Sequence, residues 1–129
     1  MDETGKCILP HHHSKNEESV IGRIPDIATI QAVSDAMKQL GDPSRLRIFW
    51  ILCHTEECVI NLAAAMQMSS PAVSHHLRLL KGAGLIVSRR MGKETYYRAA
   101  DSDLAQKFHH MVEEVAKISC PDRAEPQKP

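Results

Sequence analysis

Four cysteines are the side chains of this 129-residue sequence that are best suited to chemistry. They are Cys7, Cys53, Cys58 and Cys120. The polar start MDETGKCILPHHH and the absence of any run of about 18 apolar residues predict a cytoplasmic protein without a signal peptide or membrane span. In that compartment cysteines are more often thiols, metal ligands or redox switches than structural disulfides. Because no Cys-x-x-Cys pair occurs, a structural zinc ribbon is excluded.

Basic side chains concentrated in one segment suggest a second kind of chemistry. Residues 69–98 contain six Lys and Arg against one acidic residue, Glu94, although the whole chain has 16 basic and 16 acidic residues. A local excess of positive charge attracts a phosphate backbone, because only the surface that faces DNA has to be positive. The distribution of charge therefore favours nucleic-acid binding by this segment.

Two predicted helices position most of these residues. The first has Leu62, Ala63 and Met66 on one face and ends at residues 67–69, which suit a turn. The second begins with Ser70 as its capping residue and Pro71 at a position where a missing N–H costs nothing. Its inward stripe consists of Val73, Leu77 and Leu80, and its outward face presents Ser74, His75 and Arg78.

A β-hairpin follows the second helix. After residues 82–84 the apolar period changes from 3.6 to 2, and residues 85–87 and 95–97 flank a tip that contains Arg89, Arg90 and Lys93. Two helices joined by a tight turn and followed by a basic hairpin form a winged helix-turn-helix. In that fold the second helix enters the major groove of DNA. The hairpin, or wing, would contact phosphate beside it.

The remaining chain is expected to form an arm, two preceding helices, a last helix and a tail. We expect an N-terminal arm at residues 1–25, a winged helix-turn-helix domain at residues 26–118 and a flexible tail at residues 119–129. One helix runs to about Leu40. The next begins at Asp42-Pro43, and its buried stripe consists of Leu46, Phe49, Trp50 and Cys53.

The last helix has a narrow apolar seam and is capped by Asp101 or Ser102. Its apolar residues recur at intervals of four, three, four and three: Leu104, Phe108, Met111, Val115 and Ile118. Such a seam suits pairing with another helix. We therefore predict a mainly α fold with a β-hairpin wing, assembled as a homodimer through its first and last helices and bound to a palindromic site on double-stranded DNA.

The chain resembles the ArsR/SmtB family of dimeric winged-helix metal-sensing repressors. Four segments carry the resemblance, in this order: LGDPSRLRIFWILC, ECVINLA, SSPAVSHHLRLLKGAGLIVSRRMGKETYYR and AADSDLA. It covers about residues 20–118, and AVSHHLRLLKGAGLI followed by GKETYYR is its most diagnostic part. Repressors of this family control metal efflux or sequestration genes and leave the operator when the ion binds. The resemblance implies operator contacts by a set of helix and wing residues, which are Ser70, Ser74, His75, His76, Arg78, Arg89, Arg90 and Lys93.

The resemblance also implies a metal site. One branch of the family, which senses cadmium, lead and zinc, binds the ion through thiolates at the third helix and cysteines from the other subunit's arm. Cys58 lies where that branch has Cys-Val-Cys, with Ile60 at the second thiolate position. The implied ligands are Cys7, His11 and Cys58, with His12, His13 and Cys53 as further candidates. Sulfur and imidazole together suit Zn²⁺, Cd²⁺ or Pb²⁺ rather than Mg²⁺ or Ca²⁺.

A second metal site of the family, which bridges the two last helices, is expected to be dismantled. Its ligand positions correspond here to Asp101, Asp103, Glu114 and Lys117, and a lysine repels a cation. His109 and His110 fall outside that register. His110 with Glu113 or Glu114 would make a different site, but both histidines are expected to be exposed and solvated.

Two alternatives to metal sensing involve the other cysteines. The first is a redox-sensing or persulfide-sensing repressor on the same fold, in which Cys53 and Cys120 form a disulfide. The second is an enzyme that uses the pair Cys53-His54. The sequence contains no oxyanion-hole turn, no Gly-rich phosphate loop and no third residue to orient the base, so we predict that the protein is not an enzyme.

Overall fold

The computed structural model describes residues 9–121. The chain divides into two compact units, Met1–Gln31 and Ala32–Pro129. The first contains the short helix α1 (Glu17–Ile21). The Glu17 carboxylate accepts backbone N–H bonds from His13 at 2.8 Å and Ser14 at 3.3 Å, which hold the segment before the helix against its first turn. The sequence did not predict α1, because five residues are too short to show a helical apolar period.

Helices α2 (Ile27–Leu40) and α3 (Pro43–His54) begin and end close to the predicted positions. Asp42 caps α3, and its Oδ2 accepts the backbone N–H of Arg45 at 2.9 Å. Pro43 occupies the first turn, where its missing N–H leaves no intrahelical bond unmade. This cap fixes the start of the helix that carries His54 at its last position.

The helix-turn-helix consists of α4 (Val59–Met66) and α5 (Ser70–Gly82). Gln67 ends α4 in the left-handed conformation with φ 53°. The cap of α5 is Ser69, whose Oγ accepts the N–H of Ala72 at 3.2 Å, so the prediction of Ser70 as the cap was wrong by one residue. Either serine suits the cap chemically, and helical geometry at Ser70 leaves the role to Ser69.

The wing is the hairpin of β2 (Ile86–Met91) and β3 (Glu94–Ala99). Arg89 lies opposite Tyr96 and Met91 opposite Glu94, so Gly92 and Lys93 alone form the turn. Gly92 has φ 61°, as the first central position of a type II′ turn requires. A third strand that the sequence did not predict, β1 (Glu57–Cys58), pairs with β3 and gives the sheet order β1-β3-β2.

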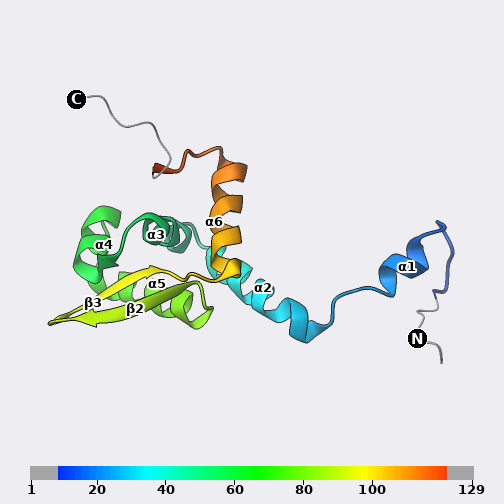
Figure 1. Cartoon of the computed structure of the whole chain (residues 1–129), viewed down its shortest axis with the longest axis horizontal. Helices are drawn as coiled ribbons and strands as arrows, with labels where there is room; N and C mark the ends of the chain where they lie inside the picture. The colour runs from blue at the N-terminus through cyan, green and yellow to red at the C-terminus, as the bar shows by residue number, and fades with distance from the viewer. Residues whose placement is uncertain (1–8, 122–129) are drawn as a thin grey trace. The chain divides into compact units, whose positions relative to one another are not determined.

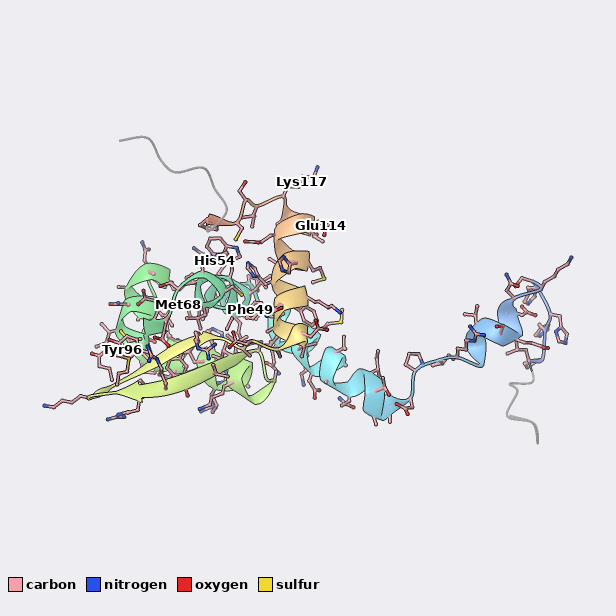
Figure 2. All side chains as sticks on the ribbon, in the orientation of Figure 1. Phe49, His54, Met68, Tyr96, Glu114 and Lys117 are labelled. Carbon is pink, nitrogen blue, oxygen red and sulfur yellow. The ribbon has the colours of Figure 1, made fainter. Side chains whose placement is uncertain are left out.

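The core lies between α3, α4, α5 and the wing, with contributions from α2 and α6 (Asp103–Ala116). Figure 1 shows α6 beside α3, and Figure 2 shows Phe49 of α3 inside this arrangement. The inward stripe of α5 is confirmed, since Val73, Leu77 and Leu80 are each at most 1% exposed. The stripe of α3 was partly wrong. Phe49 is buried together with Ile48 and Leu52, whereas three predicted core residues are only half-buried: Leu46, Trp50 and Cys53.

Helix α6 begins at the Ser102 cap, one of the two predicted, where Ser102 Oγ accepts the N–H of Ala105 at 3.2 Å. It ends at Lys117, whose left-handed φ of 56° turns the chain back. Phe108 of the predicted seam is buried, while Met111 and Val115 remain 45% and 77% exposed on this subunit. Among the described residues, no helix is both long and apolar enough to cross a membrane.

Candidate nucleic-acid interface and metal centre

The outward face of α5 presents the side chains that the sequence assigned to DNA. Ser70, Ser74, His75 and Arg78 are all exposed. Arg78 Nη2 lies 2.9 Å from His75 Nδ1. Because a guanidinium only donates, Nδ1 must accept, and a neutral His75 then carries its proton on Nε2. The pair thus offers an imidazole N–H and the remaining guanidinium donors to a DNA surface.

His76 points the other way, towards α3. Its side chain is 13% exposed, and its Nδ1 lies 3.2 Å from Nη1 of Arg45 and 4.0 Å from the Asp42 carboxylate. Burial lowers the pKa of His76, and Arg45 lowers it further while Asp42 opposes the shift. A neutral His76 that accepts from Arg45 connects the recognition helix to α3. This placement favours a positioning role over direct contact with bases.

The basic residues of the wing differ in their partners. Arg89 Nε donates to Glu56 at 2.7 Å, and a second bond joins its Nη2 to the other carboxylate oxygen. These bonds lower the pKa of Glu56 and raise that of Arg89. Arg90 Nε donates to the carbonyl of Gly92 at 3.3 Å, and Lys93 is exposed at the turn. Arg90 and Lys93 are therefore the wing cations best placed to meet phosphate.

Another polar contact joins the wing to the recognition helix. Lys81 Nζ, in the last turn of α5, donates to Ser88 Oγ of β2 at 2.7 Å. Leu80 and Ile86, on the same two elements, are buried in the common core. This hydrogen bond and the shared core packing therefore fix the position of the wing relative to α5, and the two elements form one continuous surface.

Cys58 lies at the junction between the wing sheet and α4. It is 7% exposed, it pairs with Tyr96 in the sheet, and it is the residue directly before the first turn of α4. The main hydrophobic cluster of the described residues does not include it. The Cys58 side chain is therefore buried at the point where β1 passes into α4.

The other predicted ligands of this site belong to the arm. Cys7 lies outside the described residues. His11, His12 and His13 are exposed, the rings of His11 and His13 stack with centroids 5.8 Å apart, and His12 Nδ1 lies 3.5 Å from Glu18. The structure thus groups the three histidines within the first unit.

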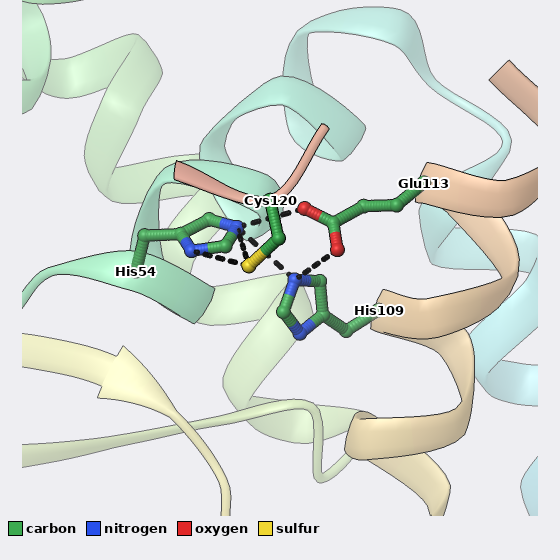
Figure 3. A group of neighbouring side chains, drawn as sticks. All are labelled: His54, His109, Glu113 and Cys120. Atoms are coloured by element: carbon green, nitrogen blue, oxygen red, sulfur yellow. Dashed lines mark hydrogen bonds and ion pairs between the residues drawn. The ribbon is translucent and has the colours of Figure 1, made fainter. Parts of the chain in front are cut away.

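A second cluster of metal-ligating side chains is present within the second unit. His54 at the end of α3 meets His109 and Glu113 of α6, and Cys120 follows the turn at the end of α6 (Figure 3). One ligand atom from each of the four residues lies within 4.8 Å of every other. This is a mixed set of nitrogen, oxygen and sulfur ligands from three segments of one chain.

The Glu113 carboxylate contacts three polar side chains of this region. Its Oε2 lies 3.0 Å from His54 Nε2 and accepts Trp50 Nε1–H at 3.1 Å, while its Oε1 lies 3.1 Å from His109 Nε2. Burial alone would raise the pKa of Glu113, but the bonds from Trp50, His109 and His54 together hold it below its ordinary value. A carboxylate that is 8% exposed is therefore kept ionised.

The sequence interpretation missed this cluster. It expected His109 to be exposed, whereas the His109 side chain is 15% exposed and faces His54; His110 is exposed, as predicted. The available signal was the spacing of His109 and Glu113 four residues apart, which places both on one face of a helix. His54 lies 55 residues before His109, and nothing in the local pattern indicates that the two meet.

Cys53, a predicted further ligand and a member of the redox pair, is half-buried beside this cluster. Burial raises the pKa of its thiol to about 12, with further contributions from Glu113 and Cys120. The thiol is therefore protonated near neutral pH, and a protonated thiol is a poor ligand and a poor nucleophile.

The positions of the bridging site on the last helix give no ligand cluster within the described chain. Asp101, Asp103, Glu114 and Lys117 are all exposed, and Figure 2 shows Glu114 and Lys117 together near the C-terminal end of α6. Asp101 pairs with Arg98 at 3.2 Å and Asp103 with Lys107 at 2.9 Å.

Comparison with known proteins identifies bacterial regulators. The model of the arsR family of bacterial regulatory proteins matches residues 42–88. A transcriptional repressor SmtB homolog of Synechocystis is 34% identical over 112 residues, which are 87% of this chain and 85% of the relative. A cadmium resistance transcriptional regulatory protein CadC homolog of Staphylococcus aureus is 37% identical over 90 residues, covering 67% of this chain and 74% of the relative.

A solved structure supports the same assignment. The homodimeric winged helix-turn-helix DNA-binding domain of a possible ArsR-family regulator from Mycobacterium bovis is similar to this chain with a TM-score of 0.65 and 33% identity. The match covers 74% of this chain and 89% of that one. The similar proteins and the fold are those of DNA-binding regulators and not of enzymes.

Proposed function

Because the chain belongs to the ArsR family of bacterial regulatory proteins and is a metal-sensing repressor of the SmtB type, we propose that Zn²⁺, Cd²⁺ or Pb²⁺ releases it from a palindromic operator. The regulated genes would serve metal efflux or resistance, in the bacterial cytoplasm. The observation that carries this proposal is Cys58, a buried thiol at the junction of α4 and the wing sheet.

The proposed DNA surface combines α5 and the wing tip. Ser70, Ser74, His75 and Arg78 would read bases from the major groove, and Arg90 and Lys93 would bind the phosphate backbone. Arg89 would reach phosphate only after its bond to Glu56 opens. His76 would act by holding α5 against α3 through Arg45.

The proposed assembly is a homodimer through α2 and α6. Met37 of α2 and Met111 of α6 line one shallow groove of about 140 Å³ and are 57% and 45% exposed. Val115, one turn further along α6, is 77% exposed. Burial of such side chains in a symmetric interface is favourable by about 25 cal/mol per Å² of apolar surface, and the resulting two-fold axis would present two recognition helices to the two halves of a palindrome.

In the proposed inducer site, the metal ion is bound by Cys58 of one subunit and by Cys7 and His11 from the arm of the other subunit. His12 and His13 are further candidate ligands. Metal binding there would act on the wing directly, because Cys58 pairs with Tyr96 in the sheet and Glu56, two residues earlier, binds Arg89. A small displacement of β1 would thus shift the wing against α5. For each tenfold loss of operator affinity, the coupling free energy between metal binding and DNA binding would have to be about 1.4 kcal/mol.

The test is a Cd²⁺ titration of the purified full-length dimer. The operator is first selected from a random duplex library, and operator affinity is then followed by fluorescence anisotropy together with thiolate-to-cadmium charge-transfer absorbance. We expect both signals to change together and Cys58→Ser or Cys7→Ser to abolish both. A dimer whose Cys58→Ser variant still absorbs and still releases DNA would contradict the proposed site.

Redox or persulfide sensing through Cys53 and Cys120 is the alternative function. The Cys120 sulfur lies 3.6 Å from Nδ1 of His54, the residue that follows Cys53, but a Cys53 thiol with a pKa of about 12 reacts slowly. We therefore place metal sensing first. Operator release by oxidant or polysulfide that depends on Cys53 and not on Cys58 would reverse this order.

A further inference from the structure

We propose that His54, His109, Glu113 and Cys120 form a second metal site, which binds one Zn²⁺ or Co²⁺ ion within a single subunit. This inference goes beyond the proposed function, because the four ligands come from α3, α6 and the segment after α6 and involve neither the arm nor Cys58.

The spacing of the ligand atoms is close to that of a tetrahedral coordination shell. With bonds of about 2.0–2.1 Å to nitrogen and about 2.3 Å to sulfur, tetrahedral ligands lie about 3.4 Å apart for two nitrogens and about 3.6 Å apart for nitrogen and sulfur. His54 Nε2 and His109 Nε2 are 3.0 Å apart, and the Cys120 sulfur is 4.0 Å from His54 Nε2. These two pairs would need shifts of about 0.4 Å around a tetrahedral cation. The most widely separated ligand atoms, which lie within 4.8 Å of one another, would have to move closer as the ion binds.

Hydrogen bonds cannot form at all the close contacts of this cluster at the same time. Each Nε2 carries at most one proton, and both Nε2 atoms lie within 3.1 Å of Glu113 as well as 3.0 Å from each other. If both imidazoles donate to the carboxylate, two N–H groups face each other across the remaining contact. A cation at the centre would accept an electron pair from every ligand atom and remove this conflict.

Charge and burial also fit a divalent ion. A carboxylate from Glu113 and a thiolate from Cys120, which would give up its proton to bind the metal, would together balance two positive charges. The His54 and Glu113 side chains are only 7% and 8% exposed. Trp50 Nε1–H donates to Glu113 Oε2 and so orients the carboxylate, as an outer-shell partner does in metal sites. A cleft of about 350 Å³, lined by His54 and His109 among others, gives an ion access from solvent.

The ligand types select the class of ion. Two imidazoles, one carboxylate and one thiolate suit a borderline ion such as Zn²⁺ or Co²⁺. Mg²⁺ and Ca²⁺ require oxygen ligands, and the softest ions require more sulfur. The fourth ligand reaches the site because Lys117 turns the chain back, with Ile118 N–H donating to the Glu113 carbonyl at 2.9 Å. Metal binding would therefore fasten the segment after α6 to α3.

The experiment titrates Co²⁺ into the full-length Cys7→Ser/Cys58→Ser protein under anaerobic conditions. This background removes the thiolates of the proposed inducer site, so failure of one site cannot be mistaken for failure of the other. We expect intense visible bands of tetrahedral cobalt and a thiolate-to-cobalt charge-transfer band, saturating at one ion per chain. Zn²⁺ should displace the cobalt and raise the melting temperature.

Substitutions in the same background assign the ligands. Cys120→Ser should abolish the charge-transfer band, and His109→Gln should weaken Co²⁺ binding at least tenfold, whereas the matched control His110→Gln, one residue further along α6, should leave binding intact. Circular dichroism checks that each variant is folded. A folded background protein that binds no Co²⁺, or a band that survives Cys120→Ser and disappears in Cys53→Ala, would overturn the proposal.

Discussion

Arg89 on the wing is ion-paired with Glu56, and Glu56 lies two residues before Cys58. The two charges are 33 positions apart in the sequence and belong to β2 and to the segment that enters β1. This bond adds a side-chain connection between the proposed inducer site and the wing to the backbone pairing of β1 with β3. It also withholds one wing cation from DNA while it is closed.

Glu56→Gln should separate these two effects. The neutral side chain frees the Arg89 guanidinium for phosphate, so operator affinity should rise about threefold. Release by Cd²⁺ should weaken in part, because the side-chain connection between β1 and the wing is lost while the backbone pairing of β1 with β3 remains. Fluorescence anisotropy with and without Cd²⁺ measures both. Glu94→Gln, the same charge change at the wing tip, is the matched control; an equal loss of Cd²⁺ response in both variants would argue against the connection.

Lys93→Ala and Arg78→Ala should weaken DNA binding in different ways. Lys93 is exposed at the turn, so its loss should reduce affinity for all sequences alike and lower the salt dependence by about one unit. Arg78, which also orients His75, should cost about 1–3 kcal/mol on the operator and little on random DNA. Binding isotherms at several salt concentrations on both duplexes distinguish the two. Equal effects on operator and random DNA would remove Arg78 from base recognition.

His76 should make the fold sensitive to mild acid. Its pKa is lowered in the folded state, so the native protein binds fewer protons than the unfolded chain, whose histidine has a pKa of about 6.5. This contribution to stability is complete above pH 6.5 and is lost as pH falls through the lower folded value. His76→Gln should flatten the dependence of the unfolding free energy on pH in that window, measured by urea denaturation. An unchanged slope would show that the Arg45 contact does not depend on a neutral ring.

Asp42 should add a second pH dependence in a more acidic range. The backbone bond from Arg45 lowers its pKa, although burial opposes the shift. The stability that Asp42 contributes is present above the unfolded pKa of about 3.9 and is lost as pH falls through the lower folded value. Asp42→Asn keeps a good N-cap and should remove the pH dependence below about pH 4. Because the Asp42 charge also raises the pKa of His76, the same substitution should lower that pKa further and increase the loss of stability in the His76 window.

Val115→Glu should convert the proposed dimer into monomers. A charge on the exposed seam of α6 would be buried opposite its own copy across a two-fold axis, which is unfavourable. Sedimentation velocity at micromolar concentration measures the result. Ile60→Glu, which changes a side chain that is 67% exposed on α4, should remain dimeric. If Val115→Glu also sediments as a dimer, the interface lies elsewhere.

Local signals were sufficient to predict the elements that carry DNA recognition. The Ser-Pro start of α5, its stripe at Val73, Leu77 and Leu80, and the period-two segments around Gly92 each reflect interactions within a few residues. The errors were equally local. The cap is Ser69 and not the predicted Ser70. The buried face of α3 includes Ile48 and Leu52, whereas three of the residues predicted for it are half-buried.

The cluster of His54, His109, Glu113 and Cys120 depends on contacts between residues far apart in the sequence, which no local sequence pattern indicates. His54 was considered only as a partner of Cys53, and His109 was expected to be solvated, because the interpretation treated α6 as a dimer helix alone. The return of the chain at Lys117, which brings Cys120 to His54, requires a left-handed backbone conformation that a lysine rarely adopts. Only the packing of α3 against α6 shows that these side chains converge.

The register of the wing assigns different tasks to two neighbouring arginines. Side chains alternate between the faces of a ribbon, so Arg90 shares a face with Ser88 whereas Arg89 shares one with Tyr96. One extra residue in each strand on the body side of Arg89 would exchange the two faces, leaving Glu56 without its partner. Natural variation in the length of this hairpin should therefore preserve parity: relatives that keep the Glu56 pair are expected to lengthen the strands by two residues or by none.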